Sequence, residues 1–98
     1  MSAYLVFNYA ITDPDGYGAY PPAAFATMSG QELEILVADY ASEPKEGEPG
    51  SVTVVLRFPS KDAALGWYDS DGYREVKHLR TDNSTGITVL CDEFVMPS

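Results

Sequence analysis

Apolar residues recur at every second position in four stretches of the chain, and this period is typical of β-strands. Residues 3–11 are largely apolar on both faces, as expected when both sides of a strand are covered. Residues 31–38, 52–58 and 85–94 give the other three strands. In the second stretch the alternation puts Leu33, Ile35 and Val37 on one face.

Helix-start signals lie between these strands. Asp13 precedes Pro14, which fits the first helical position because its missing N–H would be unpaired there anyway. The consecutive prolines at 21 and 22 predict a break, followed by a helix over residues 22–28. Ser60 is placed to cap a helix that carries Trp67 and Tyr68. A further short helix, entered at residues 71–72, carries Tyr73, Val76 and Arg80 at the spacing of one helical face.

The predicted order is therefore β-α-β-β-α-β, a ferredoxin-like α+β fold in a single domain over residues 1–98. Its four strands form an antiparallel sheet with the helices packed on one side, so the other side needs a partner. A chain of this size buries only about 60–65% of its unfolded surface. Both arguments predict a homodimer in which two sheets pack face to face.

Charge narrows the classes of partner. Fifteen acidic and six basic residues give a formal charge of −9, which disfavours nucleic acids and anionic membrane surfaces. The N-terminus has neither a basic segment nor a cleavage site, and no apolar run is long enough for a membrane helix. We expect a cytoplasmic protein that binds no nucleic acid and no membrane.

The sequence predicts no metal site and no cofactor. It has one histidine and one cysteine, without an H-x-x-x-H or C-x-x-C spacing. No glycine-rich phosphate loop follows a strand. Cys91 lies in a strand-like context that predicts a buried, inert thiol. His78 lies on the helix face opposite Tyr73 and Val76, so we expect it at the surface rather than acting as a base.

Aromatic residues supply the candidate site. Tyrosine hydroxyls and the tryptophan N–H need partners when buried, which places polar points on an apolar wall. Five aromatic residues come from helical segments that must pack on the same sheet face: Tyr17, Tyr20, Trp67, Tyr68 and Tyr73. Arg80 either complements the helix dipole and extends outward or holds an acidic ligand, and both alternatives stay open. Arg57, on the other sheet face, is expected to pair across strands or subunits.

Several motifs resemble one bacterial family, the domain of unknown function numbered thirteen-thirty, within the dimeric α+β barrel superfamily. They are residues 12–17 (T-D-P-D-G-Y), Phe58-Pro59-Ser60 with Ala63-Ala64, and W-Y-x-S-x-x-Y from Trp67 to Tyr73 with Leu79-Arg80 after it. The resemblance spans nearly the whole chain and implies a ferredoxin-like monomer that dimerises through its sheet. It implies no established activity, since the superfamily holds cofactor-independent monooxygenases, isomerases, haem-handling enzymes and regulatory ligand-binding domains. The chain departs from the family in its broken first helix and its acidic loop at residues 39–50.

These observations predict a cleft between helices and sheet that binds, and could transform without a metal, a small aromatic or acidic molecule. The predicted ligand-binding residues are Tyr17, Tyr20, Trp67, Tyr68, Tyr73 and Arg80. No catalytic residue is assigned, although a tyrosine would be the proton donor. The alternative is a non-catalytic dimeric module, structural or ligand-sensing, whose aromatics are only core. A haem-degrading enzyme is a third hypothesis, opposed by the outward position of His78.

Overall fold

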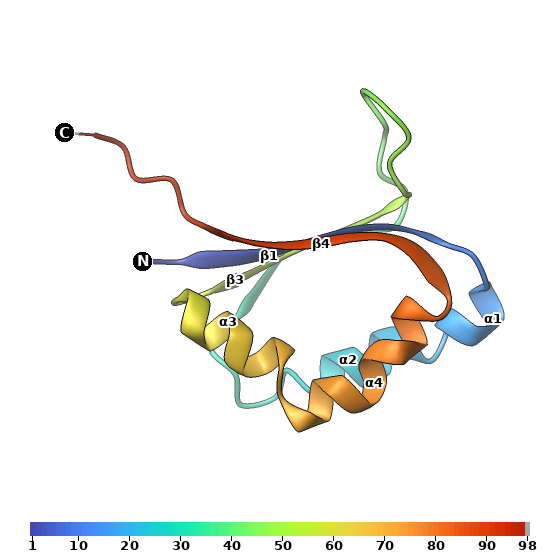
Figure 1. Ribbon diagram of the computed structural model, residues 1–98, viewed down its shortest axis with the longest axis horizontal. Coiled ribbons are helices and arrows are strands. Elements are labelled where there is room, and N and C mark those ends of the chain that lie inside the picture. The colour runs from blue at the N-terminus through green and yellow to red at the C-terminus, as the bar shows by residue number, and fades with distance from the viewer. Residues whose placement is uncertain (98) are drawn as a thin grey trace.

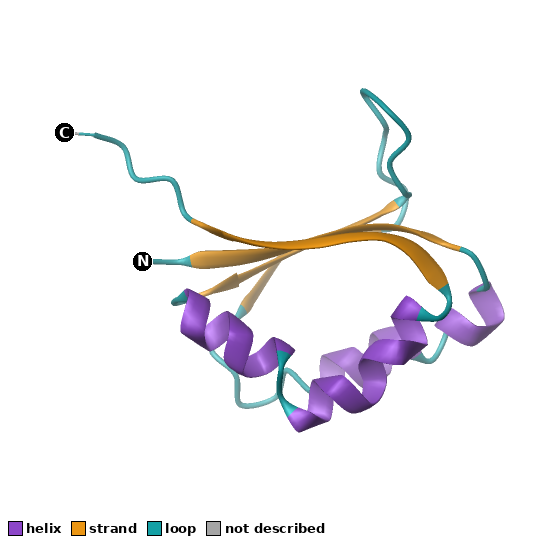
Figure 2. Cartoon of the chain, viewed as in Figure 1, coloured by secondary structure: helices purple, strands orange, loops and turns teal. Residues whose placement is uncertain are grey.

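The computed structural model describes residues 1–97. Its elements, in chain order, are β1 (Ala3–Ile11), α1 (Pro14–Tyr17), α2 (Tyr20–Ala26), β2 (Glu34–Asp39), β3 (Val52–Phe58), α3 (Lys61–Tyr68), α4 (Asp71–Thr81) and β4 (Ser84–Asp92). The strands form one antiparallel sheet in the order β2-β3-β1-β4. All the helices lie on one face of this sheet (Figures 1 and 2). The predicted ferredoxin-like α+β fold is confirmed.

Strand β1 lies at the centre of the sheet and shows how its two faces differ. It pairs with β3 on one side and with β4 on the other. Leu5, Phe7 and Tyr9 are buried beneath the helices. Val6 and Asn8 alternate with them and point to the face without helices, which we call the open face. The core therefore lies entirely between the sheet and the helices.

Three side-chain caps start the helices. Asp13 accepts a hydrogen bond from the Gly16 backbone N–H at the start of α1, as the sequence predicted. Ser60 accepts one from Ala63 N–H at the start of α3, which was also predicted. Ser70 caps α4 through Tyr73 N–H and was not identified from the sequence. A break is present, but it lies at residues 18–19, before the paired prolines, which occupy the first turn of α2. This helix spans Tyr20–Ala26 rather than the predicted residues 22–28.

The predicted face pattern of the second strand is wrong at Val37. The register of β2 against β3 shifts between Ile35 and Val37, so that Val37 pairs with Val55. Val55 in turn lies opposite Val6 on the open face. A bulge inserts one residue and thereby moves every later side chain to the other face.

The prediction of a buried Cys91 is also wrong. Cys91 is exposed in the chain and lies on the open face, opposite Tyr4. The Cys91 Sγ donates a long hydrogen bond to the Tyr4 carbonyl oxygen. Strand β4 lies at an edge of the sheet, and it ends at residue 92 rather than at Phe94, which is exposed. His78 is exposed on α4, as predicted. Within residues 1–97 no helix has the length and apolar content that crossing a membrane requires.

Candidate functional site

One aromatic cluster joins the helices to each other. The rings of Trp67 and Tyr73 lie 4.2 Å apart between centroids, and Tyr73 also packs on Tyr68 at 5.4 Å. The hydroxyls of Tyr73 and Tyr20 are 2.6 Å apart, which links α4 to α2. The indole N–H of Trp67 donates to Thr27 Oγ1 at 3.0 Å. The predicted aromatics from α2, α3 and α4 therefore do meet.

A second set of tyrosines forms a chain of hydroxyls. Tyr9, on β1, is 2.6 Å from Tyr17, on α1, between hydroxyl oxygens. The Tyr17 hydroxyl then donates to the Tyr40 hydroxyl at 3.2 Å. Tyr9 and Tyr17 are buried, whereas Tyr40, just after β2, is about half exposed. The chain thus runs from the core to the surface.

Arg80 lies in the core beside both sets of tyrosines. It is only 6% exposed, and its guanidinium carbon lies 5.2 Å from the Phe7 ring centroid and 5.8 Å from those of Tyr9 and Tyr20. No carboxylate forms an ion pair with it within residues 1–97. Its Nε is buried without a hydrogen-bond partner. The neighbouring rings and the polar side chains of Tyr73 and Tyr20 therefore compensate for this buried positive charge.

Burial keeps the buried tyrosines protonated. It raises the pKa of Tyr17, and the hydrogen bonds to Tyr40 and Tyr9 raise it further. Burial also raises the pKa of Tyr20, and the neighbouring Tyr73 adds to the effect. The pKa of Tyr9 is raised by burial, although the hydrogen bond to Tyr17 and the charge of Arg80 act in the opposite direction. At neutral pH these groups are therefore neutral hydrogen-bonding phenols.

An apolar cleft of about 170 Å³ opens between α2 and strands β2 and β3. Phe7, Leu56 and Trp67 are almost fully buried in its floor, whereas Phe25 and Tyr40 are exposed at its rim. The remaining lining residues are Tyr20, Pro21, Ala24, Met28, Ile35, Ala38 and Val54. None of the described lining residues is charged.

The structure divides the six predicted ligand-binding residues into two groups. Tyr20 and Trp67 line the cleft. The other four are not in its walls: Tyr73 and Arg80 contact Tyr20, Tyr17 contacts Tyr40, and Tyr68 packs on Trp67 and lies under Lys77. Tyr40, placed by sequence reasoning in an acidic loop, was missed. The bulge in β2 hid its position, and its contact with Tyr17 joins residues 23 positions apart.

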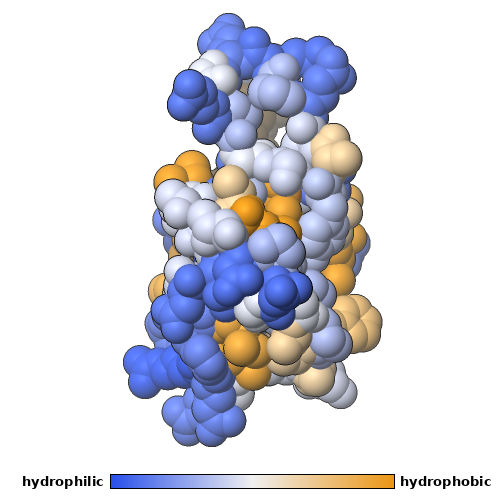
Figure 3. All heavy atoms as spheres, turned by 90° about the vertical axis from the view of Figure 1, so that its right-hand side faces the viewer, coloured by the Kyte–Doolittle hydropathy of each residue, from blue (hydrophilic) through white to orange (hydrophobic). Residues whose placement is uncertain are grey.

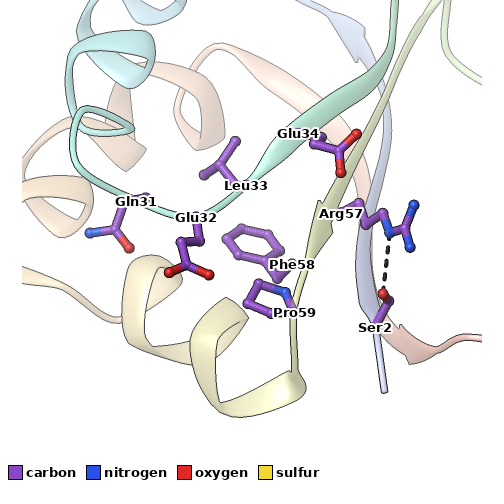
Figure 4. A pocket seen from close by; sticks show the side chains of 8 residues that line it. All are labelled: Ser2, Gln31, Glu32, Leu33, Glu34, Arg57, Phe58 and Pro59. Carbon is purple, nitrogen blue, oxygen red and sulfur yellow. Dashed lines mark hydrogen bonds between the residues drawn. The ribbon is translucent and has the colours of Figure 1, made fainter.

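A second, polar cavity of about 430 Å³ lies at the start of β2 (Figure 4). Glu34 and Arg57 point to the same side there, and Arg57 Nε donates to Ser2 Oγ at 3.2 Å. The cavity does not reach the tyrosines, and its wall carries exposed charges from Glu32 and Glu34. Because water competes for every such polar contact, we take the apolar cleft as the candidate site. No group of three or more His, Cys, Asp or Glu side chains within residues 1–97 is arranged to hold a metal ion.

Residues 2–94 match the sequence model of a family described as "Domain of unknown function (DUF1330)". The chain belongs to this family. No functionally curated protein matches the sequence of this family member.

Solved structures with similar folds share little sequence with this family member. SnoaB, a cofactor-independent oxygenase from Streptomyces nogalater, has a TM-score of 0.67 at 12% identity, covering 97% of this chain and 95% of that one. RPA0582, a protein of unknown function from Rhodopseudomonas palustris, also has a TM-score of 0.67 at 12% identity, covering 98% and 84%. Rv0793 from Mycobacterium tuberculosis has a TM-score of 0.58 at 16% identity, covering 98% and 99%. At such identities the likeness establishes the fold alone.

Two substitutions of Arg80 are expected to differ in stability. Arg80→Ala leaves a cavity and removes the cation from three rings, and should lower the free energy of unfolding by about 2–4 kcal/mol. Arg80→Met refills most of the volume without a charge that must be desolvated, and should cost about 1 kcal/mol or less. Urea denaturation of both variants measures the difference. Equal losses would mean that the charge itself, rather than its volume, stabilises the core.

Proposed function

We propose that this protein binds a small aromatic molecule, about one ring in size, in the cleft between α2 and the sheet. The observation that carries the proposal is the apolar cleft itself, which is lined by Phe7 and Trp67 and also by Tyr20 and Tyr40. An apolar cavity of about 150 Å³ is sufficient to bind benzene in a protein interior. A volume of about 170 Å³ is therefore matched to one ring. It is below the roughly 300 Å³ at which pockets for larger ligands begin.

The lining favours an aromatic ligand over an acidic one. No described lining residue carries a charge. Arg80, which the sequence offered as an anchor for an acid, lies behind Phe7 and Tyr20. A carboxylate in the cleft would lose its hydration without gaining an ion pair.

Catalysis in this cleft would have to use a tyrosine hydroxyl as the proton donor. Tyr20 and Tyr40 are the described lining residues with an ionisable side chain. SnoaB has a similar fold and is a cofactor-independent oxygenase, which is compatible with metal-free chemistry on this scaffold. The alternative is a non-catalytic dimeric module, and it applies if the cleft takes no ligand.

Filling the cleft tests the proposal. Ala38 lines it, and Ala38→Phe should occupy the space that a ring would use. Toluene is expected to raise the melting temperature of the unmodified protein, because a ligand that binds only the folded state stabilises it. The rise should disappear in Ala38→Phe and persist in Ala41→Phe, a matched change at an exposed position outside the cleft. An unchanged midpoint in the unmodified protein, across toluene and a wider set of one-ring compounds, would favour the module.

We also propose that the protein is a homodimer joined through the open face. Val89 and Ile87 on β4 and Val37 on β2 are exposed there in the single chain. Four strands spaced by about 4.8 Å give a face on the order of 500 Å², less than the roughly 800 Å² per partner of a stable interface. Loop 40–51 and the C-terminal segment project on the same side and can supply the remainder (Figure 1). Figure 3 shows the loop as a hydrophilic projection above the body, which suits the rim of an interface.

A charge on the open face should separate the subunits. The unmodified protein is expected to sediment at twice the chain mass of 10.7 kDa. Val89→Glu buries a carboxylate in each half of the interface and should shift the population to monomer. Leu65→Glu, on the exposed side of α3, should leave the dimer intact. Monomer at all concentrations in the unmodified protein would contradict the proposed assembly.

A further inference from the structure

The hydroxyls of Tyr9, Tyr17 and Tyr40 form a chain of hydrogen bonds that ends at a residue lining the cleft. We propose that the cleft selects an aromatic ring bearing a neutral oxygen that accepts a hydrogen bond, such as an aryl ketone, and that Tyr40 is the donor to it. This inference rests on the proposed binding function and names the ligand class for the same site. It makes Tyr40 a specificity-determining residue, because the residue both lines the cleft and ends the chain.

Each phenol has a single hydrogen to donate, and this fixes the order of the chain. The Tyr17 hydroxyl donates its hydrogen to the Tyr40 oxygen. The 2.6 Å contact between Tyr9 and Tyr17 must therefore have Tyr9 as its donor. The hydrogen of Tyr40 is not used by any described residue, and Tyr40 lines the cleft, so we assign this hydrogen to the ligand. The oxygen of Tyr40 already accepts from Tyr17, which favours a ligand that accepts over one that donates.

The other polar groups of the cleft are already paired. The Trp67 N–H donates to Thr27 Oγ1, and Thr27 donates in turn to the Ala24 carbonyl oxygen at 2.6 Å. The Tyr20 hydroxyl is 2.6 Å from that of Tyr73. A ligand that displaced either pair would leave a buried polar group without a partner, which is unfavourable. Tyr40 is therefore the group that can bond a ligand without breaking an existing contact.

The charge of the ligand follows from the position of Arg80. Its guanidinium faces the rings of Phe7, Tyr9 and Tyr20, and the rings of Phe7 and Tyr20 form part of the wall between it and the cleft. A neutral ketone oxygen loses little hydration on entering, and a hydrogen bond from Tyr40 replaces the one that it loses to water. A carboxylate would need a cation, and none of the described lining residues is one. The cleft should accordingly prefer acetophenone to benzoate.

Two probes of equal shape isolate the hydrogen bond. Acetophenone and α-methylstyrene differ in having C=O or C=CH₂ on the same ring, so their affinities share every apolar contact. The measured quantity is the affinity for acetophenone divided by the affinity for α-methylstyrene. This ratio should be higher in the unmodified protein than in Tyr40→Phe. The ratio of the two affinities is expected to change by about fivefold to tenfold, as for one net hydrogen bond. Titrations followed by nuclear magnetic resonance give both constants.

The controls distinguish this inference from the binding proposal on which it rests. Tyr68→Phe, outside the cleft walls, should leave the affinity ratio unchanged. The affinity of α-methylstyrene reports the shape of the cleft, and its preservation in Tyr40→Phe shows that the variant is folded around the same space. A ratio that is the same in Tyr40→Phe and the unmodified protein would overturn the role of Tyr40 while leaving ring binding intact. Failure of both probes to bind the unmodified protein would overturn both proposals.

Discussion

Raising the pH above 10 is expected to unfold this protein steeply. Burial raises the pKa of Tyr9, Tyr17 and Tyr20 in the folded state, while in the unfolded chain these phenols titrate near pH 10. Above that pH the unfolded state binds fewer protons, so the free energy of unfolding falls with rising pH. Below pH 10 the contribution is fully present. While all three remain protonated in the folded state, they give a slope of up to about 4 kcal/mol per pH unit. A domain with about 5 kcal/mol of stability should therefore unfold near pH 11, and one with about 15 kcal/mol only near pH 14.

Two spectroscopic signals check this expectation. Far-ultraviolet circular dichroism follows the fold, and ultraviolet difference absorbance follows phenolate formation. The loss of structure should coincide with the ionisation of the buried tyrosines. Tyr17→Phe removes one of the three groups and should make the stability slope shallower by about 1.4 kcal/mol per pH unit. Complete phenolate formation near pH 10 in a protein that keeps its circular dichroism would contradict the assignment of these tyrosines to a closed core.

Trp67→Ala is expected to be the most destabilising substitution at the site. Trp67 is 1% exposed, stacks on Tyr73 and Phe58, and donates its N–H to Thr27. Its removal should lower the free energy of unfolding by about 3–5 kcal/mol. Urea denaturation should be followed by circular dichroism, because Trp67 is the single tryptophan and its fluorescence disappears with it.

Two further substitutions help to explain the stability lost in Trp67→Ala: one removes the hydrogen-bond partner of the indole, and the other is a control on the exposed side of α3. Thr27→Val removes the acceptor of the indole N–H and should cost about 1–3 kcal/mol, since the donor is left buried and unpaired. Leu65→Ala, on the exposed side of the same helix, should cost no more than about 0.5 kcal/mol. A Trp67→Ala variant as stable as Leu65→Ala would show that α3 does not anchor the core through this residue.

Local rules account for most of the fold. Alternation in residues 3–11 predicts the strand that is observed, and one face of it is buried beneath the helices. The predicted caps at Asp13 and Ser60 are confirmed, because capping depends on residues three positions apart. The bulge in β2 was not visible in the alternation. Its position depends on pairing with β3, and it reverses the face of Val37. Cys91 was misplaced for a related reason, because its context is apolar but its side chain points to the face without helices.

The candidate site was predicted less completely than the fold. Helical spacing brought Tyr73 and Arg80 to the inward face of α4, and both are buried there. Spacing within one helix does not say which inward residues border a space and which fill it. Tyr20 and Trp67 border the cleft, while Arg80 lies one layer behind. The Tyr40 hydroxyl contacts that of Tyr17, 23 positions earlier in the chain, and no local sequence pattern predicts this contact.

The sequence alone determined the membership of the chain in its family, the order of the elements and the inward faces of β1, β3 and α4, because each of these depends on neighbouring residues. Only the tertiary structure decided where empty space remains and that, among residues 1–97, tyrosine side chains and aromatic rings rather than a carboxylate surround Arg80. It also decided that the tyrosine hydroxyls form a chain ending at Tyr40, which lines the cleft. Those features arise where segments distant in the sequence pack together. Their positions depend on the sum of many contacts rather than on any one repeat.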